Sequence, residues 1–150
     1  MIRKALIKDA KAIQTVINVY AKEEKMLARS LNDIYESIRN FFVYENENGI
    51  VQGCCASEIF WEDIAEIRSL AVSKDALGKG IGKELVFACM KEAKELGIKK
   101  VFALTYIDDF FKKLGFKIIS RDDLPHKVWK VCINCPKFPD CDEIAVEKEL

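Results

Sequence analysis

Three glycines stand within five positions of the segment ALGKGIGK, immediately before a stretch with the pattern of a good helix. Gly78, Gly80 and Gly82 let the backbone come close to a ligand and turn its N–H groups toward it. The first helical turn adds unpaired N–H donors, and Lys79 and Lys83 add positive charge. The segment predicts a cradle for a phosphate-bearing ligand, although a tight strand-to-helix connection would explain the glycines alone. Its spacing matches neither a Walker A loop nor the G-x-G-x-x-G motif.

A second chemically suggestive cluster lies in the C-terminal segment 126–142. One histidine and three cysteines have the spacing H-x5-C-x2-C-x5-C: His126, Cys132, Cys135 and Cys141. These side chains could hold a tetrahedral zinc ion, but we favour reduced thiols packed under a lid near the substrate, without a metal. Three further cysteines stand in apolar runs and are expected to behave as small buried hydrophobes: Cys54, Cys55 and Cys89.

Composition narrows the classes of function. The chain has 150 residues, a length typical of one domain, and its 24 Lys plus Arg balance 24 Asp plus Glu. A net charge of zero gives no support to nucleic-acid binding, which depends first on neutralising phosphates. No apolar stretch approaches the roughly 20 residues that span a bilayer. The start, MIRKALIKDAK, lacks the apolar core of a signal peptide, so we expect a cytoplasmic protein without membrane contact.

The elements that must position these residues alternate in type along the chain. Apolar residues at spacings of three and four predict helices within 10–20, 31–38, 81–96 and 108–115. Strands are expected over 1–6, 64–72, 101–106 and 117–120, with a hairpin over 41–61 that turns at 46–49. The last segment, EIAVEKEL, predicts a final edge strand. Without a linker or repeat, residues 1–150 are expected to form one α+β domain, a mixed sheet with helices packed on it.

Two longer segments resemble a known superfamily. EIRSLAVSKDALGKGIGKELV is similar to the pyrophosphate-binding segment of GNAT acetyltransferases, and FFKKLGF resembles the segment that lies beside the pantetheine arm in that superfamily. Within it, the segments IRKA, LARS, AEIRSLAV, FALTY and LPHKVW look like the acetyltransferase domain of stand-alone N-acetylglutamate synthases. The resemblance implies a twisted, mostly antiparallel mixed sheet of about six or seven strands, flanked by about four helices. It also implies acetyl-coenzyme A as cosubstrate and L-glutamate as acceptor, the first step towards arginine.

The resemblance also implies which residues hold the cosubstrate. Gly80 and Gly82 match the glycines of the loop, and Leu77 stands where the superfamily usually has Gln or Arg. The preceding strand would hold the pantetheine through backbone groups. The complete implied set is Leu70, Ala71, Val72, Leu77, Gly78, Lys79, Gly80, Ile81, Gly82, Lys83, Phe110 and Phe111.

Amide formation from a thioester requires a neutral amine, a polarised carbonyl and a stabilised thiolate. An α-amino group has a pKa near roughly 8, and Glu66 is the residue best placed to take its proton. By resemblance, the backbone at Leu70 polarises the carbonyl. Many relatives use a Tyr as general acid where this chain has Phe111, and Tyr106 is the candidate replacement. For Tyr106 we favour the role of a packed aromatic side chain with a solvated hydroxyl.

Four residues are expected to bind the acceptor. Glutamate carries two carboxylates, for which a guanidinium is a natural partner. Arg29, in LARS, matches the substrate-binding arginine of the synthases, and the backbone of Ser69 matches a substrate contact. Arg68 is a second guanidinium, which could instead simply form a salt bridge with Glu66. Lys127, or alternatively Lys130 or Lys137, could replace an arginine that the synthases carry near their C-terminus.

Two other functions fit the sequence. The enzyme could acetylate a different amine, such as another amino acid, a polyamine or a protein N-terminus. A catalytically weak protein could instead bind coenzyme A as a sensor, with the cysteine cluster as its metal or redox element. The expected partner is a small-molecule amine, and a homodimer is left open.

Overall fold

In the described part of the chain, seven strands form one mixed sheet in the order β1-β2-β3-β4-β5-β7-β6. The computed structural model describes residues 1–124 and 143–150. The strands are β1 (Ile2–Lys4), β2 (Phe41–Glu45), β3 (Val51–Trp61), β4 (Ile64–Val72), β5 (Lys100–Thr105), β6 (Lys117–Ile119) and β7 (Ile144–Glu149). Neighbours pair antiparallel except β4 and β5, which are parallel. The predicted fold class, a mostly antiparallel mixed sheet with helices packed on it, is confirmed.

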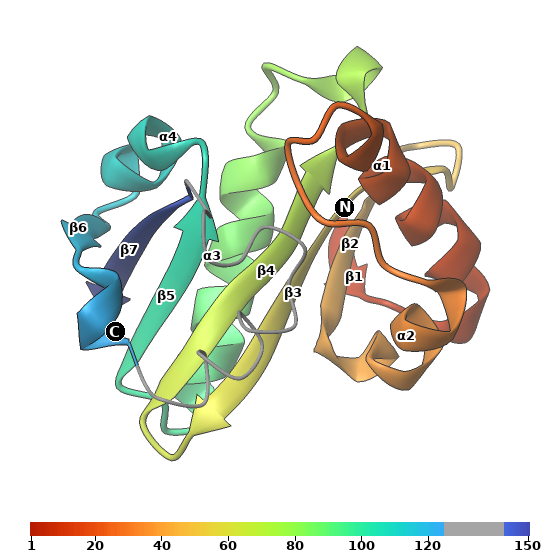
Figure 1. The fold of residues 1–150 in the computed structure, drawn as a ribbon. Coiled ribbons are helices and arrows are strands. Elements are labelled where there is room, and N and C mark those ends of the chain that lie inside the picture. The colour runs from red at the N-terminus through yellow and green to blue at the C-terminus, as the bar shows by residue number, and fades with distance from the viewer. Residues whose placement is uncertain (125–142) are drawn as a thin grey trace.

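Helices cover both faces of this sheet (Figure 1). The described residues contain four α-helices, α1 (Ala10–Lys22), α2 (Leu31–Glu36), α3 (Ile81–Glu95) and α4 (Asp108–Lys113). One core is formed where α1 and α2 pack on β2, β3 and β4, with Ile13, Ile17 and Ile34 fully buried. The other core lies under α3, whose apolar face buries Leu85 and other residues at helical spacing. No helix in 1–124 or 143–150 has the length and apolarity needed to cross a membrane.

The hairpin between β2 and β3 forms as the sequence predicts. Asn46 makes the turn, because its side-chain oxygen accepts hydrogen bonds from the backbone N–H groups of Asn48 and Ile50, at 2.9 and 3.0 Å. Gly49 supplies the positive φ of 75° that closes it. The hairpin sets the register of β3, which in turn holds β4 along most of its length.

The last strand is not an edge strand, and that prediction is wrong. β7 lies between β5 and β6, so the described sheet ends at β1 and β6. The strand carries several charges, but Glu147 contacts a lysine on each neighbouring strand, Lys100 at 3.5 Å and Lys117 at 3.7 Å. Cross-strand ion pairs therefore allow a charged strand to occupy an interior position.

The parallel strands β4 and β5 pair over only a short length. Their register covers three residue pairs, and the last of them joins Glu66 to Phe102. Beyond this pair the two strands diverge toward the ends where the α3 and α4 connections begin (Figure 1). The second half of β4 therefore borders an opening in the sheet, and this opening positions the site.

Candidate functional site

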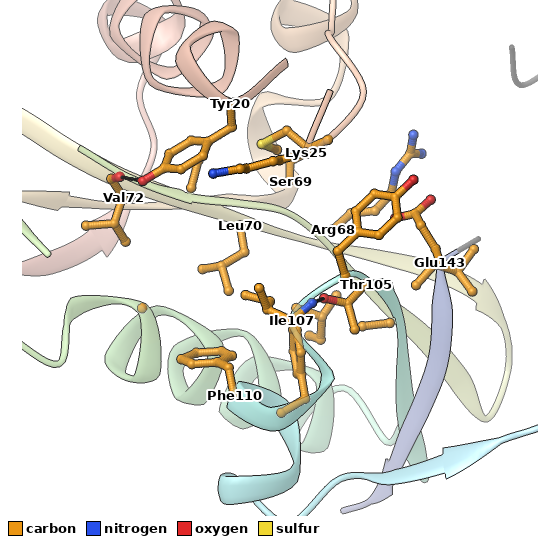
Figure 2. Close-up of a pocket in the computed structure, with 18 of the residues that line it drawn as sticks. Tyr20, Lys25, Arg68, Ser69, Leu70, Val72, Thr105, Ile107, Phe110 and Glu143 are labelled. Carbon is orange, nitrogen blue, oxygen red and sulfur yellow. Dashed lines mark hydrogen bonds between the residues drawn. The ribbon is translucent and has the colours of Figure 1, made fainter. Parts of the chain in front are cut away.

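A cavity of about 800 Å³ lies where β4 and β5 separate. Its walls come from the α1–α2 segment, the second half of β4, the start of α3, the end of β5 and the start of α4. Figure 2 shows these side chains converging from elements far apart in the sequence. The lining is largely apolar, with Arg29, Arg68 and Glu143 near Glu66 at one end and Lys83 at the start of α3. A cavity of this kind can hold a long ligand with one reactive, polar end.

A β-bulge interrupts β4 beside this cavity. Cys54 of β3 pairs with Ala71, and Ala56 pairs with Arg68, so Ser69 and Leu70 together face Cys55 alone. Ser69 has a φ of 56°, a left-handed conformation that costs a non-glycine residue about 1–3 kcal/mol. The bulge turns the backbone of Ser69 and Leu70 relative to a regular strand.

Two glycines give the loop before α3 its conformation. Gly78 and Gly80 have φ values of 80° and 79°, and Gly80 is the N-cap residue of α3. Neither position would bring a Cβ atom within 4 Å of its surroundings, so the requirement is conformational. Gly82 differs from our expectation, because it is already part of α3 and lacks a positive φ. A Cβ there would touch the ring of Phe110 at 3.5 Å, an ordinary contact.

Glu66 is a buried carboxylate at the polar end of the cavity. It lies on the last residue pair between β4 and β5 and has 6% of its surface exposed. Burial is the main reason that the pKa of Glu66 is raised to about 8; Arg68 opposes the rise, and Glu58 and Glu143 contribute to it. A carboxyl group with a pKa near neutral can take up and release a proton under ordinary conditions.

The two arginines at this end share one carboxylate. Glu58 on β3 contacts Arg68 Nη1 at 3.0 Å and Arg29 Nη1 at 3.3 Å. Arg68 lies farther from Glu66, with 3.9 Å between Nε and Oε1, so the expected Glu66–Arg68 pair is the weaker one. The side chain of Arg68 is 28% exposed and that of Arg29 only 5%. Arg68 is therefore the guanidinium that a ligand can reach more easily.

Aromatic side chains form the wall at α4. Phe111 is buried, and its ring centroid lies 5.1 Å from those of Phe110 and Phe116 in edge-to-face contacts. Phe110 faces the cavity from the start of α4 (Figure 2). Tyr106, at the end of β5, also lines the cavity.

Sequence reasoning missed several residues of the site. Tyr20 has helical spacing with apolar residues, which assigned it to the core, yet its hydroxyl donates to the Val72 carbonyl at 2.5 Å (Figure 2). Arg121 and Glu143 also line the cavity, with Arg121 donating to the Glu143 carbonyl oxygen at 3.0 Å. They flank the segment 125–142, and no local pattern marks them. Glu58 is recognisable only once β3 and β4 are in register.

The predicted site residues in the described ranges converge on this cavity with one exception, Lys79, which is exposed and does not line it. The lining includes Arg29, Glu66, Arg68, Ser69, Leu70, Ala71, Val72, Leu77, Gly78, Gly80, Ile81, Gly82, Lys83, Tyr106, Phe110 and Phe111. Lys127, His126, Cys132, Cys135 and Cys141 lie outside the described residues. The other three cysteines, Cys54, Cys55 and Cys89, are buried as expected. Within 1–124 and 143–150, no group of three or more His, Cys, Asp or Glu residues could hold a metal ion.

Comparison with known proteins identifies relatives over most of the chain. The model of the acetyltransferase (GNAT) domain family matches residues 37–118. An uncharacterized N-acetyltransferase from Chlorobaculum tepidum is 44% identical over 149 residues, which cover 99% of this chain and 96% of that protein. An amino-acid acetyltransferase from Mycobacterium tuberculosis is 35% identical over 131 residues, covering 86% of this chain and 75% of that protein.

Two solved structures superpose on this chain over its full length. The N-acetylglutamate synthase from Neisseria gonorrhoeae, complexed with coenzyme A and N-acetyl-glutamate, superposes with a TM-score of 0.92 at 28% identity, covering 100% of this chain and 35% of that one. A Mycobacterium tuberculosis protein in complex with coenzyme A superposes with a TM-score of 0.86 at 28% identity, covering 99% of that chain.

The pKa of Glu66 predicts how stability depends on pH. An unfolded Glu has a pKa near 4.5 and the folded one about 8, so the native state binds more protons between these values. The free energy of unfolding should therefore fall as pH rises through this window, by up to ~1.4 kcal/mol per pH unit from this group, and level off above it. In Glu66→Gln this contribution is lost. Urea unfolding of both proteins between pH 4.5 and 9 checks the expectation, and parallel curves would contradict it.

Proposed function

The chain belongs to the GNAT acetyltransferase family, and we propose that its acceptor is the α-amino group of an amino acid, L-glutamate. The protein is an acetyl-coenzyme A-dependent N-acetyltransferase. In our proposal it catalyses the first step of arginine biosynthesis in the cytoplasm. The observation that carries the acceptor assignment is the polar end of the cavity, where the buried base candidate Glu66 lies beside the accessible guanidinium of Arg68.

We place acetyl-coenzyme A along the open edge of β4. The pyrophosphate would lie at the start of α3, where the loop of Gly78 and Gly80 directs N–H groups and the helix dipole favours an anion. The pantetheine arm would follow Val72 and Ala71 toward the bulge, between β4 and Phe110. Lys83 lines the cavity near the phosphates and adds positive charge there.

In the reaction, the acceptor nitrogen attacks the thioester carbonyl carbon, and the C–S bond breaks to release coenzyme A as a thiolate. Glu66 takes the proton that the ammonium group must lose, directly or through a water molecule. The backbone N–H of Leu70, in the bulge, would donate to the developing oxyanion. A thiol with a pKa of about 8.5 is a tolerable leaving group near neutral pH, so Phe111 in place of a tyrosine slows the step without preventing it. Tyr106 lies in the same cavity and is our candidate for protonating the thiolate.

The charges around Glu66 favour an anionic acceptor. Arg68 keeps part of its guanidinium toward the cavity while Glu58 holds its Nη1. Lys25 also lines the cavity, but its ammonium group contacts Glu23 at 3.3 Å and extends toward Tyr20, away from Arg68 (Figure 2). A carboxylate of the acceptor would gain a charge-assisted hydrogen bond at Arg68, and its ammonium group would then lie near Glu66.

The glycine cradle can be tested with two equivalent substitutions. Gly80 and Gly97 flank α3, with φ values of 79° and 94°, and neither would bring a Cβ within 4 Å of other atoms. Gly80→Ala and Gly97→Ala should therefore lower the free energy of unfolding similarly, by about 1–2 kcal/mol. Only Gly80→Ala should weaken coenzyme A binding in calorimetry, roughly tenfold, because a hydrogen bond to a charged group is worth about 1.5–3 kcal/mol. Equal affinities of the two variants for coenzyme A would contradict the proposal that this loop binds the pyrophosphate.

The acceptor can be identified from the products formed with a panel of amines. The parent protein is incubated with acetyl-coenzyme A and L-glutamate, L-glutamine, L-norvaline, a polyamine or a peptide, and products are read by mass. We expect acetylglutamate to dominate. In our proposal Arg68 holds the side-chain carboxylate, which norvaline lacks. Arg68→Gln should therefore raise KM for glutamate roughly 10–100-fold and change KM for norvaline little, because only glutamate loses a charge-assisted bond of about 1.5–3 kcal/mol.

Each other outcome has a distinct meaning. Preferred acetylation of norvaline, the polyamine or the peptide would contradict glutamate as the acceptor and leave the acetyltransferase chemistry intact. An unchanged KM for glutamate in Arg68→Gln would remove Arg68 from the acceptor site. Absence of any product, with coenzyme A still bound, would support a sensor instead of the proposed reaction.

A further inference from the structure

Ser69 holds an unfavourable backbone conformation at the reacting end of the cavity. In the described residues, only Glu24 and Ser69 are non-glycine residues with positive φ. Glu24 lies in the exposed turn that follows α1, whereas Ser69 lies inside the central strand, next to Leu70. Such a conformation persists inside a strand only where the surrounding contacts determine it.

Two contacts fix Ser69 from the α1–α2 face of the sheet. Its hydroxyl oxygen accepts a hydrogen bond from Arg29 Nη1 at 3.1 Å. Its carbonyl oxygen accepts one from the thiol of Cys54 at 3.3 Å. Burial raises the pKa of Cys54 to about 12, so the thiol keeps the proton that it donates. The side chain and the main chain of Ser69 are thus each held by a buried partner.

Arg29 is itself held in place by the protein. Its Nε donates to Asp33 at 2.7 Å, and its Nη2 donates to the hydroxyl of Ser37 at 3.1 Å. Its Nη1 contacts Glu58 as well as Ser69, and its guanidinium lies 5.1 Å from the ring centroid of Phe41. Four oxygen-bearing side chains therefore surround a guanidinium whose side chain is only 5% exposed.

We propose that Arg29 is a positioning residue that acts through Ser69 to fix the bulge, and with it the backbone N–H of Leu70. This inference rests on the proposed acetyl transfer, in which that N–H polarises the thioester carbonyl. The resemblance to N-acetylglutamate synthases implies a direct contact between Arg29 and the acceptor. We assign the acceptor carboxylate to Arg68 instead, because four side chains already contact the Arg29 guanidinium and the Arg29 side chain is 5% exposed, against 28% for Arg68.

A double-mutant cycle between Arg29 and Ser69 separates the two roles. Arg29→Lys keeps the positive charge but loses the branched guanidinium with its several N–H donors, and Ser69→Ala removes only the hydroxyl. Each should lower kcat about tenfold, because a small misplacement of a catalytic group has effects of this size, with KM for the acceptor changed less than about twofold. The double variant should be no slower than the slower single variant, since both remove the same contact.

Ser37→Ala is the matched control. It removes a hydroxyl that accepts from the same guanidinium at the same 3.1 Å, but Ser37 lies outside β4. We expect its kcat to stay within about twofold of the parent value. Multiplying effects of Arg29→Lys and Ser69→Ala, or a large rise in acceptor KM in Arg29→Lys alone, would overturn the proposal and favour direct binding.

Amide hydrogen exchange tests the positioning role of Arg29 without any measurement of turnover, and therefore separately from the proposed function. Amide hydrogen exchange of Ser69 and Leu70 is measured in the free parent and variants, with thermal unfolding confirming that each variant is folded. Arg29→Lys and Ser69→Ala should both accelerate exchange at these amides, and Ser37→Ala should not. Unchanged exchange in both variants would overturn the positioning role whether or not an acceptor has been found, whereas a parent protein that exchanges as expected but forms no product would contradict only the acetyl transfer.

Discussion

The short parallel ladder between β4 and β5 is the constraint on which the rest of the site depends. Because pairing ends at Glu66 and Phe102, the following part of β4 has an edge that borders the cavity instead of a neighbouring strand. The bulge at Ser69 and Leu70 falls within this edge and turns its backbone. α3 begins just beyond the strand, so a helix N-terminus, an open strand edge and a buried carboxylate follow one another along a single path. A long ligand with an anionic middle and a reactive end fits this order of groups.

The arginines beside this edge are paired with carboxylates of the protein. Glu58 balances Arg29 and Arg68 together, and Asp33 takes a second position on Arg29. Glu66 lacks so close a cationic partner, and burial therefore dominates its pKa. The distinction explains how two carboxylates that face each other across β3 and β4 can have different tasks, one structural and one chemical.

Local chemistry in the sequence predicted most of the elements and the conformation of the loop at Gly78 and Gly80, because turn residues, helical spacing and the demand for positive φ act over a few positions. Glu66 could be proposed but not placed, since a strand carboxylate is equally at home on a surface. The Ser69 conformation, the bridge through Glu58 and the interior position of β7 were not predictable. Each arises from register between segments 10 to about 50 residues apart, and the sequence of any one segment carries no sign of it. Lys79 does not line the cavity, because charge beside a glycine loop says nothing of the direction in which the side chain points.

The role of Glu66 as general base is tested most directly by single-turnover acetyl transfer in Glu66→Gln, with the affinity for coenzyme A determined in parallel. Gln has nearly the shape of Glu but cannot take a proton from the acceptor, and loss of a general base costs typically 10²–10⁴-fold in rate. We predict a loss in this range with an unchanged affinity for coenzyme A, and for the parent a rate that rises with pH through about 8. Equal rates for parent and variant would contradict the central claim that the open edge of β4 brings the thioester to a buried base.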